Sequence, residues 1–70
     1  MNARQNTSRN DGTVVSVRGS VVDARFQQHL PGMHHELRAG EQGTIIVEVM
    51  THLDGQTARG IALNSTRGLS

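Results

Sequence analysis

The sequence predicts an all-β domain: a small antiparallel β-barrel of five to six strands, closed or partly open. Eight glycines and one proline divide the 70 residues into short segments, and these residue types mark turns. The segments between them are rich in Val, Ile and Thr, which pleated strands favour. We find no apolar stripe of helical period. The expected strands cover residues 12–18, 21–26, 33–38, 43–52 and 56–63.

The chain has the size of one small domain. Its apolar fraction is 34 %, Phe26 is its single aromatic residue, and it has no cysteine. A chain of this length buries only about 60 % of the surface that its unfolded form exposes. No disulfide or thiolate metal site can supplement the core. Residues 1–11, "MNARQNTSRND", lack an apolar stretch, so we expect a disordered lead-in followed by a barrel domain over 12–70.

The first two strands form a predicted hairpin, "GTVVSVRGSVVDARF". Gly19-Ser20 suits a two-residue type II′ turn. That turn sets three pairs on one nearly apolar face: Val17 with Val22, Val15 with Ala24, and Thr13 with Phe26. The other face carries Asp23 and Arg25, which we interpret as solvated or cross-strand charges. No second acid or base lies beside Asp23, so we do not predict a catalytic carboxylate there.

A second hairpin is predicted in "VEVMTHLDGQTARGIAL", residues 47–63. The grouping of His52, Asp54 and Arg59 could belong to a catalytic site or to the tip of a hairpin. Asp54-Gly55 between two strand-like runs favours a type I′ turn, and Arg59 then lies far down the strand. This spacing offers no nucleophile and base, and we predict no catalytic residue. The expected pairs are His52–Thr57, Met50–Arg59, Glu48–Ile61 and Ile46–Leu63 on one face, and Val47–Ala62, Val49–Gly60 and Thr51–Ala58 on the other.

The two faces of the second hairpin differ in character. One face is small and apolar, as the inside of a narrow barrel requires. The other is too apolar to meet only water, which indicates contact with another domain or subunit. Scattered surface aliphatic residues are the alternative. The predicted interface residues are Ile46, Met50, Ile61 and Leu63.

Metal binding and nucleic-acid binding are both poorly supported. His34 and His35 are adjacent, so on a strand they point to opposite faces and cannot share an ion. We therefore predict no metal site. A small β-barrel that binds nucleic acid is the alternative function, because such barrels use basic grooves and aromatic platforms. The net charge is only +1 and the seven arginines are interspersed with acids, which argues against that class.

An ordered series of segments resembles the beginning of the beta subunit of rotary ATP synthases. The segments are "GTVVSVRGSVVDARF", "LPG" and "IIVEVMTHLDGQTARGIALNSTRGL", and the resemblance covers residues 12–69. Ala24, Val47 and Asn64 stand where the family commonly has Val, Leu and Asp, and "GMHHELRAGE" replaces a family segment. These departures are similar to those of the divergent, second-copy bacterial beta subunits.

The resemblance implies an N-terminal barrel that joins the barrels of alpha subunits in a crown. In that family three alpha and three beta subunits alternate, and the crown holds the catalytic hexamer together. The parent subunit would make or hydrolyse ATP, coupled to ion movement across the membrane. Its expected place is the cytoplasmic face of the bacterial inner membrane, as a peripheral protein that meets the membrane only through the whole complex.

The resemblance also implies that parts of the parent subunit are absent from this chain. The family binds Mg-ATP or ADP with a phosphate loop, Gly-x-x-x-x-Gly-Lys-Thr, and this chain has no lysine. We therefore expect no cofactor-binding residue here. The family barrel also takes a further strand after Gly-Leu. We expect a fragment whose barrel lacks its last strand and whose open edge permits self-association.

Overall fold

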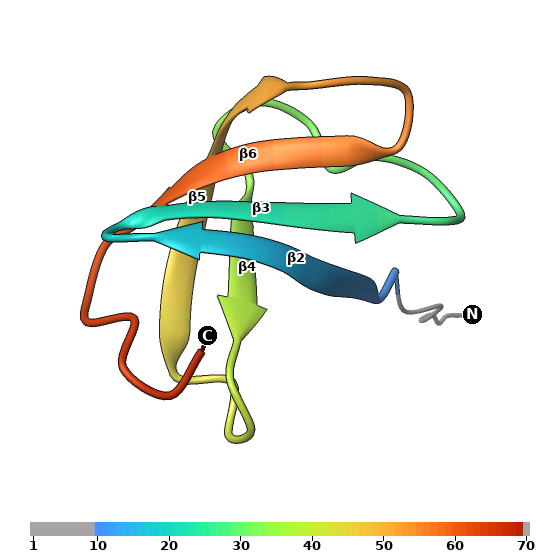
Figure 1. Ribbon diagram of the computed structural model, residues 1–70. Coiled ribbons are helices and arrows are strands. Elements are labelled where there is room, and N and C mark those ends of the chain that lie inside the picture. Colours follow the sequence, from blue (N-terminus) through green and yellow to red (C-terminus); the bar gives the residue numbers. More distant parts are fainter. Residues whose placement is uncertain (1–9, 70) are drawn as a thin grey trace.

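The computed structural model describes residues 10–69 as one five-stranded antiparallel sheet (Figure 1). The order in the sheet is β2-β3-β6-β5-β4. In Figure 1, β2, β3 and β6 run side by side, whereas β5 and β4 cross them steeply. Over residues 10–69 the sheet is thus coiled into a half-barrel with β2 and β4 as its edge strands, which confirms the partly open barrel. The strands are β2 (Gly12–Arg18), β3 (Val21–Phe26), β4 (Glu36–Ala39), β5 (Ile45–His52) and β6 (Thr57–Ala62).

Strand bounds agree with the sequence prediction except around β4. β2 and β3 match their expected ranges, and β5 and β6 lie within theirs. β4 begins at Glu36 rather than at residue 33, because His34 adopts a left-handed backbone with φ of 66°. The backbone still pairs with β5 there: the His34 N–H donates to Val49 O at 2.7 Å, and the Val49 N–H donates to His35 O at 2.9 Å.

A β-bulge at Val15 overturns part of the predicted first register. Val17 pairs with Val22 as expected, and Gly19, with φ of 60°, fits the predicted II′ turn. The register shifts between Val14 and Ser16, so Val14 rather than Val15 pairs with Ala24. Val15 is consequently 55 % exposed. The predicted pair of Thr13 with Phe26 is also wrong, since Thr13 faces Arg25 and Gly12 faces Phe26.

A second bulge lies at Met50, in the β5–β6 hairpin. Val47–Ala62, Glu48–Ile61 and Val49–Gly60 pair as predicted, and the Leu63 N–H donates to Ile46 O at 2.8 Å. Beyond the bulge the predicted pairs are wrong. Thr51 instead of Met50 faces Arg59, and His52 faces Ala58 instead of Thr57.

The type I′ turn predicted for Asp54-Gly55 is also wrong. Neither residue has positive φ. The loop spans residues 53–56, closed by the Leu53 N–H donating to Thr57 O at 2.8 Å. Within it, Asp54 Oδ1 accepts the Gln56 N–H at 2.8 Å. Aspartate is favoured both in an Asx turn and in a type I′ turn, so the sequence alone did not distinguish these two turn types.

The core lies on the concave face of the sheet, in two clusters. Leu37 of β4 packs against both. Of the residues predicted for the inner face of the second hairpin, Thr51 is exposed and the other five are buried, namely Val47, Val49, Ala58, Gly60 and Ala62. The first cluster contains Val22, Ile45, Val47 and Ala62, and the second contains Ala24, Phe26, Val49 and Ala58.

The N-terminal lead-in falls mostly on residues 1–9, which lie outside the described residues. Asn10 is described, and its Nδ2 donates to His29 O at 2.8 Å. Within the described range, no helix is long and apolar enough to cross a bilayer.

Candidate subunit interface

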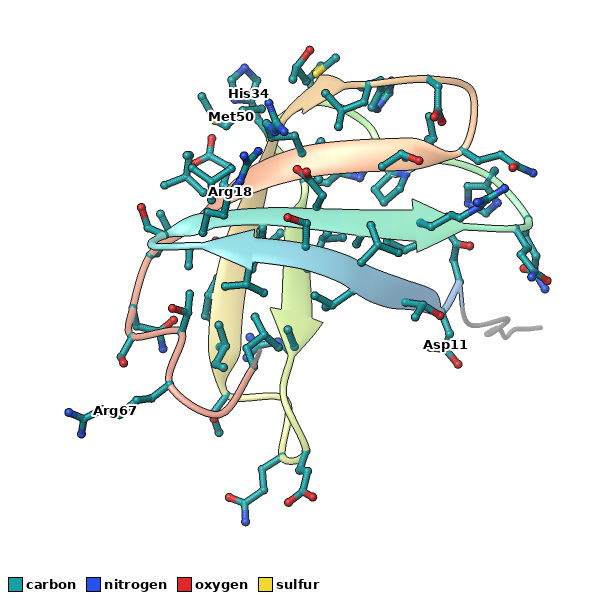
Figure 2. All side chains as sticks on the ribbon, in the orientation of Figure 1. Asp11, Arg18, His34, Met50 and Arg67 are labelled. Atoms are coloured by element: carbon teal, nitrogen blue, oxygen red, sulfur yellow. The ribbon has the colours of Figure 1, made fainter. Side chains whose placement is uncertain are left out.

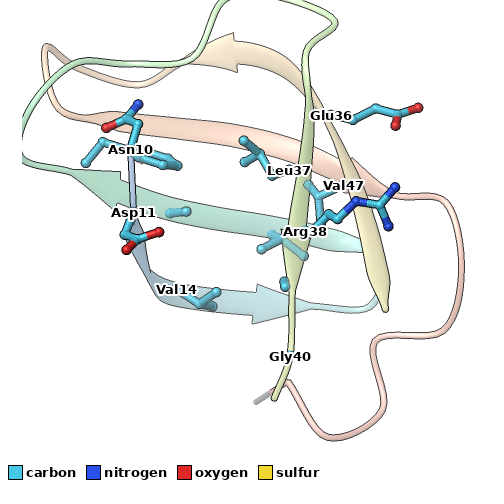
Figure 3. A pocket seen from close by; sticks show the side chains of 13 residues that line it. Asn10, Asp11, Val14, Glu36, Leu37, Arg38, Gly40 and Val47 are labelled. Atoms are coloured by element: carbon cyan, nitrogen blue, oxygen red, sulfur yellow. The ribbon is translucent and has the colours of Figure 1, made fainter. Parts of the chain in front are cut away.

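The outer face of the half-barrel is built from side chains that alternate with the core residues. On β4, Leu37 points into the hollow of the sheet, while Glu36 and Arg38 point away from it (Figure 3). On β5, Ile46 and Glu48 alternate with the buried Ile45, Val47 and Val49. Strand alternation therefore places the outer residues of all five strands on one convex surface.

Strand pairing joins five of these residues into a row across the whole sheet. Glu36 faces Glu48, Glu48 faces Ile61, Ile61 faces Val21, and Val21 faces Arg18. We call this set of five residues the transverse row. It is acidic at the β4 and β5 end, apolar in the middle, and basic at the β2 end. Figure 2 shows Arg18 projecting from the sheet in the region where His34 and Met50 also project.

The predicted interface residues cluster around the middle of this row. Ile46 and Ile61 are half-buried, Met50 is exposed at its bulge, and Leu63 is 57 % exposed. Val21 adds a half-buried apolar side chain beside Ile61. Sequence reasoning missed Val21, because the β3–β6 pairing that brings it there joins strands distant in the chain. We call Val21, Ile46, Met50, Ile61 and Leu63 the outer patch.

Next to the outer patch lies a nearly buried ion pair between β3 and β6. Arg59 donates from Nε to Asp23 Oδ1 at 2.8 Å and from Nη2 to Oδ2 at 3.0 Å. Asp23 is only 6 % exposed, so the cross-strand reading is confirmed and the solvated one is wrong. The Arg59 hydrogen bonds hold the pKa of Asp23 below its ordinary value, against the opposing effect of burial. The charges of Arg59 and Arg18 lower that pKa further.

The histidines have separate partners. His34 donates from Nδ1 to Glu48 Oε2 at 2.9 Å, and His52 Nε2 lies 2.8 Å from Pro31 O. Because a carbonyl oxygen can only accept, Nε2 of His52 carries the proton. Over residues 10–69, no group of three His, Cys, Asp or Glu side chains is arranged to hold a metal ion.

A hollow of about 530 Å³ opens on the concave side between the two edge strands (Figure 3). Val14, Val22, Ala24, Phe26 and Val47 contribute its apolar wall, and the charged residues Asp11, Glu36 and Arg38 also line it. Among these lining residues Arg38 is the one cation that could meet a phosphate, and the carboxylates of Asp11 and Glu36 would repel it, whereas bound nucleoside triphosphates are held by several backbone N–H groups and cations. The chain also lacks the lysine of a phosphate loop.

The fold defines a small half-barrel whose outer face carries several apolar side chains, and comparison with known proteins identifies the family of the barrel. Residues 14–70 match the family described as the ATP synthase alpha/beta family, beta-barrel domain. The chain belongs to this family and corresponds to its barrel domain.

Curated relatives carry the name of one subunit type. The chain is 58 % identical to ATP synthase subunit beta 2 of Syntrophotalea carbinolica over 59 residues, covering 84 % of this chain and 12 % of that protein. It is 49 % identical to ATP synthase subunit beta 1 of Marinomonas sp. over 69 residues, covering 91 % and 14 %. The chain therefore spans only about an eighth of the length of these relatives. Second-copy subunits are among them, and the nucleic-acid alternative gains no support.

Proposed function

We propose that this chain is the N-terminal barrel of an ATP synthase beta subunit and docks against alpha subunits through its outer patch. The observation that carries the proposal is the outer patch on a domain of this family. Apolar side chains there would be removed from water by a neighbouring barrel. A ring of such barrels would hold the catalytic hexamer in register while other domains move.

The activity belongs to the longer subunit in this proposal. That subunit would make or hydrolyse ATP coupled to ion translocation, and it would bind Mg-ATP or ADP outside this segment. It would be peripheral, at the cytoplasmic face of the bacterial inner membrane. The names of the relatives support this assignment.

Two exposed leucines provide a matched test of the docking surface. In a chimera, this chain would replace the corresponding barrel of the Syntrophotalea carbinolica beta 2 subunit, purified together with its alpha subunits. We expect Leu63→Asp, inside the outer patch, to abolish the alpha–beta hexamer in size-exclusion chromatography. Leu53→Asp should leave it intact, because Leu53 is similarly exposed, at 46 %, but lies in the 53–56 loop. Equal assembly of both variants would refute the docking surface.

We also propose that residues 12–70 form part of a barrel completed by a further strand. The open hollow between β2 and β4 supports this, since the core residues Val22, Ala24, Phe26 and Val47 contribute to its lining. Appending about 10 residues, a typical strand and turn, from the same relative should raise the melting temperature. An unchanged melting temperature would contradict the proposal.

A further inference from the structure

We propose that the outer face also binds a second copy of this chain, as a two-fold symmetric dimer. The proposal goes beyond the alpha-subunit assignment and does not depend on it. It rests on the transverse row, whose ends carry opposite charge and whose middle is apolar. A face patterned in this way is complementary to itself, which is the requirement for an isologous interface.

The symmetry axis that satisfies the row lies in the interface, between β3 and β6 and parallel to these two strands. At the level of the row, this axis places β2 of one copy over β5 of the other, and β3 over β6. Arg18 then meets Glu48 of the second copy, and Val21 meets Ile61. Each contact occurs twice. Arg18 and Glu48 are three strand spacings apart within one chain, about 14 Å, so both contacts lie at the margins of the apolar strip.

The neighbouring row obeys the same symmetry. Asp23 and Arg59 are Cα partners on β3 and β6, so the axis places Asp23 of one copy over Arg59 of the other. Arg38 and His34 are the other charged or titratable groups near the acidic end. Arg38 faces Ile46 in the adjacent row, and His34 already donates to Glu48. No like charges are brought together along either row.

Convexity limits the strength of this dimer. Two convex faces meet along a narrow strip, and the interface is expected to fall below the roughly 1,200 Å² of stable complexes. The long side chains of Arg18 and Glu48 suit such an interface, because they can reach across the widening gap at its margins. We therefore expect weak association that an alpha subunit would displace from the same face.

Charge reversal followed by mixing tests the geometry. Sedimentation equilibrium of the 70-residue chain should show a monomer–dimer equilibrium. Arg18→Glu and Glu48→Arg should each raise the dissociation constant at least about tenfold, because like charges would then oppose each other twice. A mixture of the two variants should form a heterodimer with affinity near that of the unchanged chain, since both contacts regain opposite charges.

Circular dichroism would verify that each variant is folded. Glu48 contacts His34 within its own chain, so a salt series on the unchanged chain provides a second measurement should Glu48→Arg not fold. Raising the salt concentration should weaken the dimer severalfold, because its marginal contacts are exposed ion pairs. A chain that stays monomeric at millimolar concentration, or a dimer insensitive to salt and to Arg18→Glu, would overturn the proposal. The latter result would point to pairing of the free edges of β2 and β4.

Discussion

Gly60 lies where β6 approaches β5 too closely for any side chain. A Cβ at this position would lie 2.5 Å from Val47 Cγ1 and 2.6 Å from Glu48 O. One of these atoms belongs to the backbone, so relief requires the strands to separate. We expect Gly60→Ala to destabilise the fold by about 3 kcal/mol, the upper part of the usual range for overpacking. Urea unfolding would measure it, and Gly55→Ala, in open space, is the control. Equal urea midpoints for Gly60→Ala and Gly55→Ala would contradict the close approach of β6 to β5 at Gly60.

The Asp23–Arg59 pair makes the stability of the fold dependent on pH. The pKa of Asp23 is lowered in the folded state, chiefly by the Arg59 hydrogen bonds, whereas an unfolded Asp titrates near 3.9. A lowered pKa contributes stability that is complete above about pH 4–5 and is lost as pH falls through the folded value. The melting temperature should therefore fall below pH 4.

Asp23→Asn should flatten this acid dependence and lower the melting temperature at neutral pH. Asp54 adds a contribution of the same sign, because the Gln56 N–H lowers the pKa of its carboxyl. Asp54→Asn is therefore the informative control. If Asp23→Asn and the unchanged chain had parallel melting curves from pH 5 to pH 2, the ion pair would contribute nothing to acid stability.

At the scale of elements, the end of β5 is held by His52, whereas the glycine of the following loop makes no conformational demand. His52 holds the carbonyl of the buried Pro31 and so ties β5 to the segment that precedes β4. Gly55 adopts no positive φ and has no neighbour that a Cβ would meet.

His52→Ala should therefore cost about 1 kcal/mol, the usual net value of one hydrogen bond. Gly55→Ala should stay within about 0.5 kcal/mol, as surface substitutions do. Thermal melts of both variants would compare them. If Gly55→Ala lost more stability than His52→Ala, the type I′ turn predicted from the sequence would be supported instead.

A strand could be predicted where the turn residues and side-chain alternation that define it lie close together in the sequence. β2 and β3 were placed correctly because a Gly-Ser turn and period-2 alternation lie within 15 residues of each other. The bulges at Val15 and Met50 were not predictable. The alternation of apolar and polar side chains around each position fits strand pairing with the bulge as well as without it. The left-handed backbone of His34 also carries no sequence signal, since histidine does not require positive φ.

At the scale of the whole molecule, the order of the strands in the sheet could not be predicted from patterns of residues. β3 pairs with β6, which places Asp23 beside Arg59 across 36 positions of sequence. No turn signal encodes such a pairing. The outer patch was nevertheless anticipated in Ile46, Met50, Ile61 and Leu63, because an apolar outer face is visible within one hairpin. Their role at a subunit contact stays a prediction.

The isolated chain should bind no Mg-ATP measurably. Its hollow is lined mainly by core side chains, and neither a lysine nor a phosphate loop is available to hold the phosphates. Isothermal titration of the chain with Mg-ATP would check this, with a complete beta subunit as the positive control. Saturable binding in the micromolar range would show that this domain itself binds nucleotide, and the prediction would be wrong.

The points where the chain enters β2 and leaves β6 determine how a pulling force would load the sheet. Gly12 lies at one end of β2, whereas Thr66 is tied by its Oγ1 to Gly19 O at the other end, and Ala62 is hydrogen-bonded to Ser20 O. Figure 1 shows the chain entering β2 at one end of these strands and leaving β6 at the opposite end, so these two points lie at opposite ends of the sheet. Tension applied through them loads β2, β3 and β6 along their lengths, across hydrogen bonds that run perpendicular to the strands. Those bonds must then rupture together rather than one at a time. Single-molecule pulling should record one high-force event, and a gradual, low-force opening would contradict this loading geometry.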